Sequence, residues 1–585
     1  MKIILAFVII FLSTTARAQQ ITPYLRFQTA QAWKYDDARR KTLENIHDEK
    51  SLYDLKSGIK KKVLEMIGGL PKEKNPMNPK VTGKIKMNGF HIEKLVFESL
   101  PGFHVTALVY VPDNNPGKHP AVLVPCGHSP NGKIHYQALC QRLVQRGYLV
   151  ICWDPVGQGE RSQFWDESRG QSRYNLVCGE HAVLGNFAYL AGANLMRWEI
   201  WDGMRAIDYL LTRNDVDANR ISITGTSGGG AQSAHIGALD ERIKVVMPSC
   251  YITSLPMREY NRSYADPDSD PEQDLFGTVS SGVDHAGLLL LVYPRPVFIA
   301  AAALDFFPIE GTRKTFREVS EVYHRFNNGD KIAMAEGFHK HQFSDENQEA
   351  AFNFLDRFNQ MPAHEGLAPV NTLTEKELTV TAKGQVMMEF PDEKGLMDLV
   401  QDYYKEHQSE KRSIAYETGH VKFTPEKKSE SQYIIHHGEY LEMPLRYYQG
   451  KSNKTTILLD TAELSTRIKN GESIITFEFR GATNDNNPLA SIKANYVYNS
   501  LLNGRPYFLE MIEDVEIVLT FAREQLKLKD ITIEGSDDNQ LLLQQLPATF
   551  PAIVEKPGIS WSRIIEEKRE LWPIEYLVPG GAYVR

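Results

Sequence analysis

Short apolar segments alternate with segments of helical periodicity between residues 121 and 358. The apolar segments are mostly continuous, which is typical of strands covered on both faces and therefore of a parallel sheet. They occupy residues 121–125, 148–153, 221–224, 243–247, 297–303 and 331–335. The helical segments occupy residues 135–146, 195–212, 228–239, 311–326 and 345–358. This alternation predicts an α/β fold with a doubly wound, mostly parallel sheet, whose ligands bind beyond the carboxyl ends of the strands.

A helical lead-in and antiparallel strands are expected before this region. Apolar residues follow helical steps of three and four at Leu52, Leu55, Ile59 and Val63. Residues 90–97 and 103–111 are β-prone and are separated by Pro101 and Gly102, as in an antiparallel pair. We therefore expect a lead-in over residues 19–80 and a catalytic domain over residues 81–361.

The C-terminal part repeats this pattern in weaker form after a linker predicted at residues 362–375. Three segments match the first domain in the same order: residues 455–460 resemble the strand at 121, residues 474–481 resemble 150–157, and residues 530–535 resemble 220–225. Ordered self-similarity of this kind is typical of an internal repeat. Residues 376–585 are therefore expected to form a second, shortened and degenerate copy of the same sheet; the alternative is an unrelated α/β or α+β domain.

The N-terminus has the features of a secretory signal peptide. Met1 and Lys2 precede an apolar run at residues 3–12, and small residues lead to Ala18. We expect cleavage after Ala18 and a periplasmic or secreted protein. The run is shorter than the roughly 20 residues that span a membrane, and Gln19 stands where a lipoprotein would need Cys. No later segment resembles a membrane span.

Composition and charge narrow the function classes. The 585 residues are 42% hydrophobic and 24% charged, as in ordinary folded proteins. The net charge of −8 disfavours nucleic acid as a partner. The five cysteines are too few, and odd in number, for a disulfide framework, although one bridge stays open. Cys126 and Cys152 lie at or within apolar segments and are expected to be buried thiols.

The strongest chemical motif follows the predicted strand at 221–224. Ser227 lies between Gly225 and Gly229, and a helical segment begins directly after it. A serine raised on a sharp strand-to-helix turn needs small residues on both sides, which these glycines provide. Ser227 is therefore the expected nucleophile. A phosphate-binding loop is disfavoured because it would need a Lys-Ser/Thr pair.

A serine nucleophile needs a base and an acid, which in this arrangement follow it along the chain in the order acid, then histidine. Asp305 follows the strand at 297–303, and His339 follows the next one, so both are expected on the rim that carries Ser227. His341 is the alternative base. His285 precedes the acid and is expected to pack near the site, while Glu310 suits a helix N-terminus.

Backbone amides are expected to stabilise the oxyanion. The first donor is predicted at Gly228. The second is predicted in the loop after the strand at 121–125, from His128 or Ser129, with His128 preferred. A metal-binding role for His128 is disfavoured because neighbouring Cys126 and His135 lack the usual zinc spacings. No cofactor or metal is predicted.

Two long insertions follow strand ends and are expected to set specificity. Residues 155–194 carry Trp165, and residues 251–282 carry Arg258 and Arg262. These three side chains are the predicted substrate contacts, although loop packing explains the arginines equally well. The acidic run ending at Asp270 lacks the glycine and closing glutamate of a calcium loop and is interpreted as a solvated turn.

The second copy lacks the nucleophile. Asp537 replaces Ser227 in the aligned motif, and the later glycines are lost. This unit is expected to be catalytically inactive by this route and to serve as support, pocket wall or carbohydrate contact.

Together these motifs resemble the α/β-hydrolase superfamily, and within it the acetyl xylan esterase-like exported bacterial hydrolases. The resemblance covers roughly residues 80–360 strongly and the remainder faintly. It rests on residues 127–129 (GHS), 154–160 (DPVGQGE), 225–230 (GTSGGG), 305–308 (DFFP) and 337–339 (GFH). The chain departs from those esterases in its length and its degenerate second half.

This resemblance implies a serine carboxylesterase that removes acetyl or methyl ester groups from a polysaccharide or oligosaccharide. One alternative is an exported peptidase of the prolyl oligopeptidase type, which uses the same three residue types but would carry a preceding β-propeller. The other is a non-catalytic carbohydrate-binding protein, disfavoured because nucleophile, acid and base occur in order.

Overall fold

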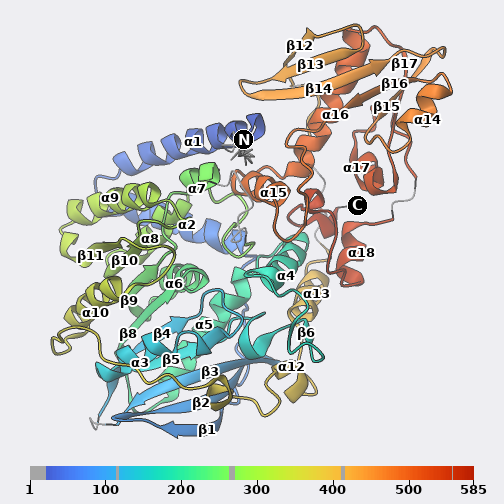
Figure 1. The fold of residues 1–585 in the computed structure, drawn as a ribbon. Helices are drawn as coiled ribbons and strands as arrows, with labels where there is room; N and C mark the ends of the chain where they lie inside the picture. The colour runs from blue at the N-terminus through green and yellow to red at the C-terminus, as the bar shows by residue number, and fades with distance from the viewer. Residues whose placement is uncertain are drawn as a thin grey trace, which may run out of the picture.

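The computed structural model describes residues 21–113, 117–261, 270–409, 416–419, 421–555 and 558–584. Within these ranges the chain forms two large sheets with helices around them (Figure 1). The predicted signal peptide lies outside the described residues, so cleavage and export stay predictions. No helix in these ranges has the length and apolarity needed to cross a membrane.

The first sheet has nine strands in the order β1-β2-β3-β5-β4-β8-β9-β10-β11. Antiparallel pairing joins β1, β2, β3 and β5, and parallel pairing joins the rest. The strands are β1 (Lys80–Lys86), β2 (Phe90–Leu100), β3 (Phe103–Pro112), β4 (His119–Pro125), β5 (Leu149–Trp153), β8 (Val216–Thr226), β9 (Ile243–Ser249), β10 (Val297–Ala302) and β11 (Ile332–Gly337). The predicted mostly parallel α/β sheet is confirmed.

Helices cover both faces of this sheet (Figure 1). The α-helices described between residues 21 and 360 are α1 (Pro23–Glu44), α2 (Glu49–Met66), α3 (Gln137–Gln145), α4 (Gly179–Leu190), α5 (Met196–Thr212), α6 (Gly228–Leu239), α7 (Leu255–Asn261), α8 (Asp284–Val292), α9 (Ile309–Arg325) and α10 (Asp345–Asn359). The sequence pattern did not predict α4, α7 or α8. Every residue of α4 and α8 is buried, so neither helix has the polar face that makes a helical period visible.

The second sheet has six strands in the order β12-β13-β14-β16-β15-β17. They are β12 (Phe423–Lys427), β13 (Gln432–His437), β14 (Leu441–Tyr448), β15 (Lys454–Leu458), β16 (Ser473–Phe477) and β17 (Asp530–Glu534). Order and direction match β1-β2-β3-β5-β4-β8 strand for strand: β14 and β16 are antiparallel, as are β3 and β5, and β15 is parallel to both its neighbours, as is β4. The second sheet is therefore a shortened copy of the first.

The copy has no counterpart of the sharp turn after β8. The short 3₁₀ helix Asp537–Asn539 follows β17 and leads into α17 (Gln540–Gln545). Ser536 and Asp537 therefore do not occupy a strand-to-helix elbow.

The chain between the two sheets packs on the first one. Residues 361–374 contain no helix or strand, and then come α11 (Glu375–Leu378), α12 (Val386–Glu389) and α13 (Leu396–Glu406). The backbone amides of Val380 and Thr381 each donate a 2.7 Å hydrogen bond to the buried carboxylate of Glu160. The second sheet thus begins at Phe423, well after the domain boundary predicted at residue 376.

The second unit contacts the loops of the first through α15 (Ile492–Leu502) and α16 (Tyr507–Glu524). Tyr498 on α15 donates a 3.0 Å hydrogen bond to Asn186 on α4. The amides of Gly277 and Val279 donate to carbonyls at the end of α15, at 2.8 and 3.0 Å. One hydrophobic core contains residues of both α4 and α16. The degenerate copy therefore supports the long insertions of the first unit.

All five cysteines lie in described segments, and each is buried and outside any disulfide. The Sγ atoms of Cys126 and Cys152 are 3.4 Å apart. Burial matches the expectation for this pair, and the structure contains no bridge.

Arg480 is the electrostatic centre of the second unit. Its guanidinium lies 2.6 Å from Asp514 and 2.8 Å from Glu513, both on α16, and it is almost fully buried. Arg480→Ala would leave these carboxylates without their cation, which typically costs about 3–5 kcal/mol. We predict that the free energy of unfolding of this unit, measured in urea, falls by the same amount. The exposed substitution Arg446→Ala should change it by less than about 0.5 kcal/mol. An unchanged transition for Arg480→Ala would contradict the assignment.

Candidate active site

Ser227 occupies a strained turn between β8 and α6. Its backbone angles are φ 61° and ψ −123°, outside the range that non-glycine residues normally adopt. Such a conformation costs on the order of 1–3 kcal/mol and persists only where its surroundings enforce it. The Ser227 amide donates a 3.0 Å hydrogen bond to the Ser249 carbonyl, which fixes the turn to the end of β9. Ser227 lines a pocket at the carboxyl ends of the strands.

Glycines around Ser227 allow the end of β4 to approach the start of α6. A Cβ atom at Gly229 would lie 2.2 Å from the Pro125 carbonyl oxygen, and one at Gly225 would lie 2.6 Å from the same atom. Real Cβ atoms do not come this close to backbone. These positions therefore require glycine because of packing, in addition to the clearance predicted for the nucleophile.

Asp305 and His341 form the acid and imidazole pair of the site. The Nδ1 atom of His341 lies 2.8 Å from Oδ1 of Asp305, whose side chain is 2% exposed. The imidazole stacks on Phe306 at 4.3 Å between ring centroids. Its other nitrogen, Nε2, has no hydrogen-bond partner in the described part of the chain, and His341 lines the same pocket as Ser227. The pair thus presents a free imidazole nitrogen on the side of the nucleophile.

His339, the base preferred from the sequence, lies elsewhere. Its side chain is 34% exposed and faces Glu346 on α10, with 3.5 Å between Nε2 and the carboxylate. The Leu304 amide donates to the His339 carbonyl at 2.9 Å, so His339 still continues the pairing of the β10 and β11 ends. Only two residues later does the chain bring an imidazole to Asp305. The contacts favour His341 over His339.

No hydrogen bond joins Ser227 and His341 within the described segments. In a site without substrate, catalytic hydrogen bonds are often long and shorten only when substrate binds. Both side chains belong to one pocket, so this geometry is compatible with a serine relay.

Backbone amides near Ser227 are available for an oxyanion. The Gly228 amide is at the first position of α6, where helix geometry supplies no acceptor. In the loop after β4, Gly127 donates to the Tyr136 hydroxyl at 2.9 Å and Ser129 donates to Gln158 at 2.6 Å. The His128 amide has no such partner among described residues. Among the described amides of this loop and at the start of α6, those of His128 and Gly228 are therefore the candidate donors to an oxyanion.

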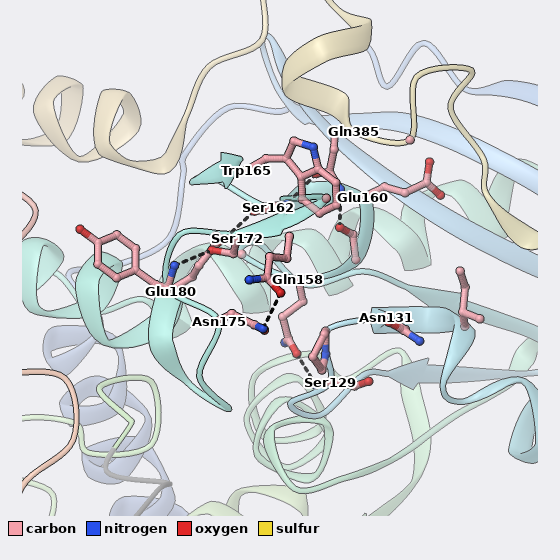
Figure 2. Close-up of a pocket in the computed structure, with 18 of the residues that line it drawn as sticks. Ser129, Asn131, Gln158, Glu160, Ser162, Trp165, Ser172, Asn175, Glu180 and Gln385 are labelled. Carbon is pink, nitrogen blue, oxygen red and sulfur yellow. Dashed lines mark hydrogen bonds between the residues drawn. The ribbon is translucent and has the colours of Figure 1, made fainter. Parts of the chain in front are cut away.

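Two pockets adjoin at the site. The pocket with Ser227 has a volume of about 440 Å³ and is lined mostly by aromatic and apolar residues, among them Tyr136, Phe306 and Phe343. The second has a volume of about 230 Å³ and is shown in Figure 2. Val177 lines both. Neither pocket has a lysine or arginine among the described residues that line it.

The second pocket has an aromatic wall and many neutral polar groups. Trp165, half-buried, stands over the pocket beside Gln385, and Asn131, Gln158 and Asn175 project from the surrounding loops (Figure 2). Exposed aromatic faces next to amides and hydroxyls are typical of sites for small polar ligands. Trp165 is thus in a position to contact substrate.

The two predicted arginines have different outcomes. Arg258 is buried behind the site: its Nη1 donates to the Phe306 carbonyl at 3.0 Å, and its guanidinium lies 4.4 Å from the Phe307 ring centroid. It is not among the residues that line either pocket, and it holds the segment that follows Asp305. Arg262 lies outside the described residues.

A buried group that the sequence analysis missed lies next to the elbow. His128, His181, Asp270 and Glu272 converge so that one donor atom from each lies within 4.8 Å of the others. Burial would lower the pKa of His181, but the charges of Glu272 and Asp270 outweigh it and raise that pKa well above its usual range. The residues come from three separate segments, so no spacing rule could reveal them, and the acidic run before Asp270 was interpreted as a solvated turn.

Comparison with known proteins finds a family match in the first unit. Residues 75–263 match the acetyl xylan esterase (AXE1) family model. The catalytic unit is acetyl xylan esterase-like. The match covers Ser227 and both oxyanion candidates, and it supports a carboxylic ester hydrolase, as predicted.

Individual relatives are distant. The Bacillus subtilis (strain 168) protein YtaP, named as a hydrolase, is 24% identical over 285 residues, which cover 45% of this chain and 86% of that protein. The solved structure of Methylesterase BT1017 is 19% identical, covers 64% of this chain and 81% of its own, and has a TM-score of 0.47. The Glucuronoyl Esterase from Solibacter usitatus is 17% identical, covers 53% and 94%, and has a TM-score of 0.41.

The glycine requirement gives a direct test. In Gly229→Ala the added Cβ would collide with the Pro125 carbonyl, so the loop after β4 must move away from Ser227. We predict that ester hydrolysis falls at least about 100-fold, since small misplacements of catalytic groups cost that much. Gly58→Ala is the control, because no atom lies within 4 Å of the added Cβ and alanine is more stable than glycine at this exposed helical position. Full activity in Gly229→Ala would show that the close approach is not needed.

Proposed function

We propose that the protein is an exported serine esterase that removes acetyl groups from a neutral polysaccharide or oligosaccharide. The observation that carries this proposal is the pairing of His341 with Asp305 at 2.8 Å, on the wall of the pocket that also holds Ser227. The family match over residues 75–263 supports ester hydrolysis.

The first half of the proposed reaction acylates the enzyme. Ser227 Oγ attacks the ester carbonyl carbon while its proton passes to Nε2 of His341, and Asp305 stabilises the resulting imidazolium. The carbonyl oxygen becomes an oxyanion that accepts hydrogen bonds from the amides of Gly228 and His128. His341 then returns the proton to the sugar oxygen as the carbon–oxygen bond breaks. The deacetylated sugar leaves, and the acetyl group stays on Ser227.

The second half regenerates the serine. A water molecule gives a proton to His341 and attacks the acetyl carbon, passing through the same oxyanion site. Collapse of this intermediate releases acetate and returns the proton to Ser227 Oγ. No group other than water is consumed.

The pockets favour a neutral carbohydrate as the alcohol part. A polyuronate chain carries a negative charge on each unesterified sugar, and its binding calls for lysine or arginine. The described walls of both pockets have none, and Glu160, Glu180 and Glu375 line the second, more polar one. An acetylated neutral chain suits this environment better than a methyl-esterified polyuronate. Acetate release from acetylated xylan, compared with methanol release from methyl-esterified pectin, tests this preference.

The choice of base is testable by two matched substitutions. His341→Ala removes the imidazole paired with Asp305, and we predict that kcat/KM on 4-nitrophenyl acetate falls by about 10⁴-fold or more, as for loss of a triad base. His339→Ala, two residues away and facing Glu346, is expected to stay within about threefold. If the two variants exchanged these effects, His339 would be the base and the proposed relay would be wrong.

Trp165 is expected to bind the sugar rather than assist the chemistry. Stacking a sugar face on the indole buries roughly 60 Å² of apolar surface, which at about 25 cal/mol per Å² corresponds to about tenfold in affinity. We predict that Trp165→Ala raises KM about tenfold on an acetylated xylo-oligosaccharide and leaves 4-nitrophenyl acetate hydrolysis unchanged. Tyr53→Ala, an exposed aromatic on α2, is the control. Equal losses on both substrates would contradict a sugar-binding role.

A further inference from the structure

Four donor atoms converge beside the nucleophile elbow. His128 Nε2 lies 3.0 Å from His181 Nδ1, 2.5 Å from Asp270 Oδ2 and 3.4 Å from Glu272 Oε1. His181 Nδ1 lies 3.4 Å from Asp270 Oδ2 and 3.0 Å from Glu272 Oε2. Four ligands arranged tetrahedrally at 2.0–2.2 Å from a zinc ion are separated by about 3.3–3.6 Å. The observed distances, to either oxygen of Glu272, run from 2.5 to 3.4 Å, so the longest reach this range and the others are shorter. Binding of an ion would therefore require the side chains to separate slightly.

Three of the four carboxylate oxygens of this group accept no hydrogen bond from a described residue, whereas Asp270 Oδ1 accepts one from the Glu272 amide at 3.2 Å. Asp270 and Glu272 are fully buried, and Asp270 Oδ2 and both Glu272 oxygens accept no hydrogen bond from any described residue. Buried carboxylate oxygens are normally bonded, because an unsatisfied one costs several kcal/mol. The Asp270 and Glu272 oxygens lie close to the imidazole nitrogens but are not aligned for hydrogen bonds with them. Lone pairs that all point at one cation have this arrangement.

One histidine is already oriented as a metal ligand. His181 Nε2 donates a 2.8 Å hydrogen bond to the Val156 carbonyl, so the proton of a neutral imidazole is on Nε2 and the lone pair of Nδ1 faces the group. Metal-binding histidines typically donate their second ring nitrogen in this way.

We propose that His128, His181, Asp270 and Glu272 bind one divalent transition-metal ion, with zinc the best fit. Two carboxylates balance the charge of a divalent cation when both imidazoles are neutral. Two nitrogen and two oxygen ligands suit zinc, whereas calcium and magnesium prefer all-oxygen sites. The rival arrangement, two imidazolium ions beside the two carboxylates, also balances charge, but the imidazole nitrogens are not aligned for hydrogen bonds to Asp270 Oδ2 or to the Glu272 oxygens.

The ion would be structural. Four protein ligands complete a tetrahedral sphere and leave no position for substrate. The ligands come from the loop after β4, from α4 and from the segment at 270–272, and so tie these three segments together. A Cβ at Gly228 would lie 2.8 Å from Glu272 Oε1 and 2.9 Å from His128 Cε1, so the group packs directly against the start of α6. Bound metal would thereby hold the His128 amide in place beside Ser227.

The test begins with metal content and location in the full-length protein. Purified protein is stripped with a chelator, dialysed against ten equivalents of zinc, freed of excess metal, and measured by inductively coupled plasma mass spectrometry. We expect about one zinc per chain and a melting temperature several degrees above that of the stripped protein. A crystal of this protein, with data collected at the zinc absorption edge, should show an anomalous peak among the four side chains.

Variants separate this site from incidental zinc binding. Glu272→Gln and His181→Ala should each reduce the bound zinc to less than about 0.2 per chain and remove the zinc-dependent rise in melting temperature. His104→Gln is the control, since His104 lies outside the proposed site and pairs with Glu393 at 2.5 Å and with Glu98 at 3.9 Å. If the variants fail to fold, the anomalous map of the wild type decides. Less than about 0.1 equivalent of zinc, manganese or cobalt in the wild type, or a peak elsewhere, would overturn the proposal in favour of a proton-sharing group.

Discussion

The site depends on the close contact between the loop after β4 and the first turn of α6. This contact exists only because Gly225 and Gly229 leave no side chain between the Pro125 carbonyl and the helix. It sets the distance between the two candidate oxyanion donors, the amides of Gly228 and His128. The strained Ser227 lies beside it. The local backbone cost of that strain, on the order of 1–3 kcal/mol, is offset by the surrounding sheet. A rigid parallel sheet, buried on both faces, is suited to supply that support.

The second sheet extends this support to the loops. It keeps the strand order of the first sheet, but the described residues after β17 form no counterpart of the turn that carries Ser227. Its helices instead contact α4 and the segment around Gly277, the parts of the first unit that carry His181 and lead from Glu272. Long insertions would otherwise be mobile because they pack on little of their own core. The second unit thus contributes to the first by burying its long insertions.

The sequence predicts the features that depend on local pattern. Buried parallel strands are continuous apolar segments, and the turn at Ser227 is marked by the glycines at 225 and 229. Both features can therefore be recognised in the sequence. The repeat was also visible, because strands β15, β16 and β17 kept their apolar pattern. Helices α4 and α8 were missed because full burial removes the polar stripe that reveals a helical period. The domain boundary was predicted at residue 376, but Val380 and Thr381 still bind Glu160 of the first unit, a contact that composition does not report.

The choice between His339 and His341 depends on how a loop turns, which residue spacing does not determine. The group around His128 and His181 depends on three distant segments meeting, which a single sequence does not encode as a motif. For the same reason Arg258 was expected in the pocket but packs behind Phe306. The positions of functional side chains on loops could therefore be determined only from the three-dimensional structure.

The most direct measurement is a crystal structure of the protein after reaction with an alkyl fluorophosphonate, which mimics the tetrahedral intermediate. The account predicts phosphorus bonded to Ser227 Oγ, one phosphonyl oxygen within hydrogen-bond distance of the amides of Gly228 and His128, and His341 Nε2 within hydrogen-bond distance of an oxygen on the adduct. Modification of a different residue, or an adduct on Ser227 whose oxygen points away from both amides while His339 occupies the site, would contradict it.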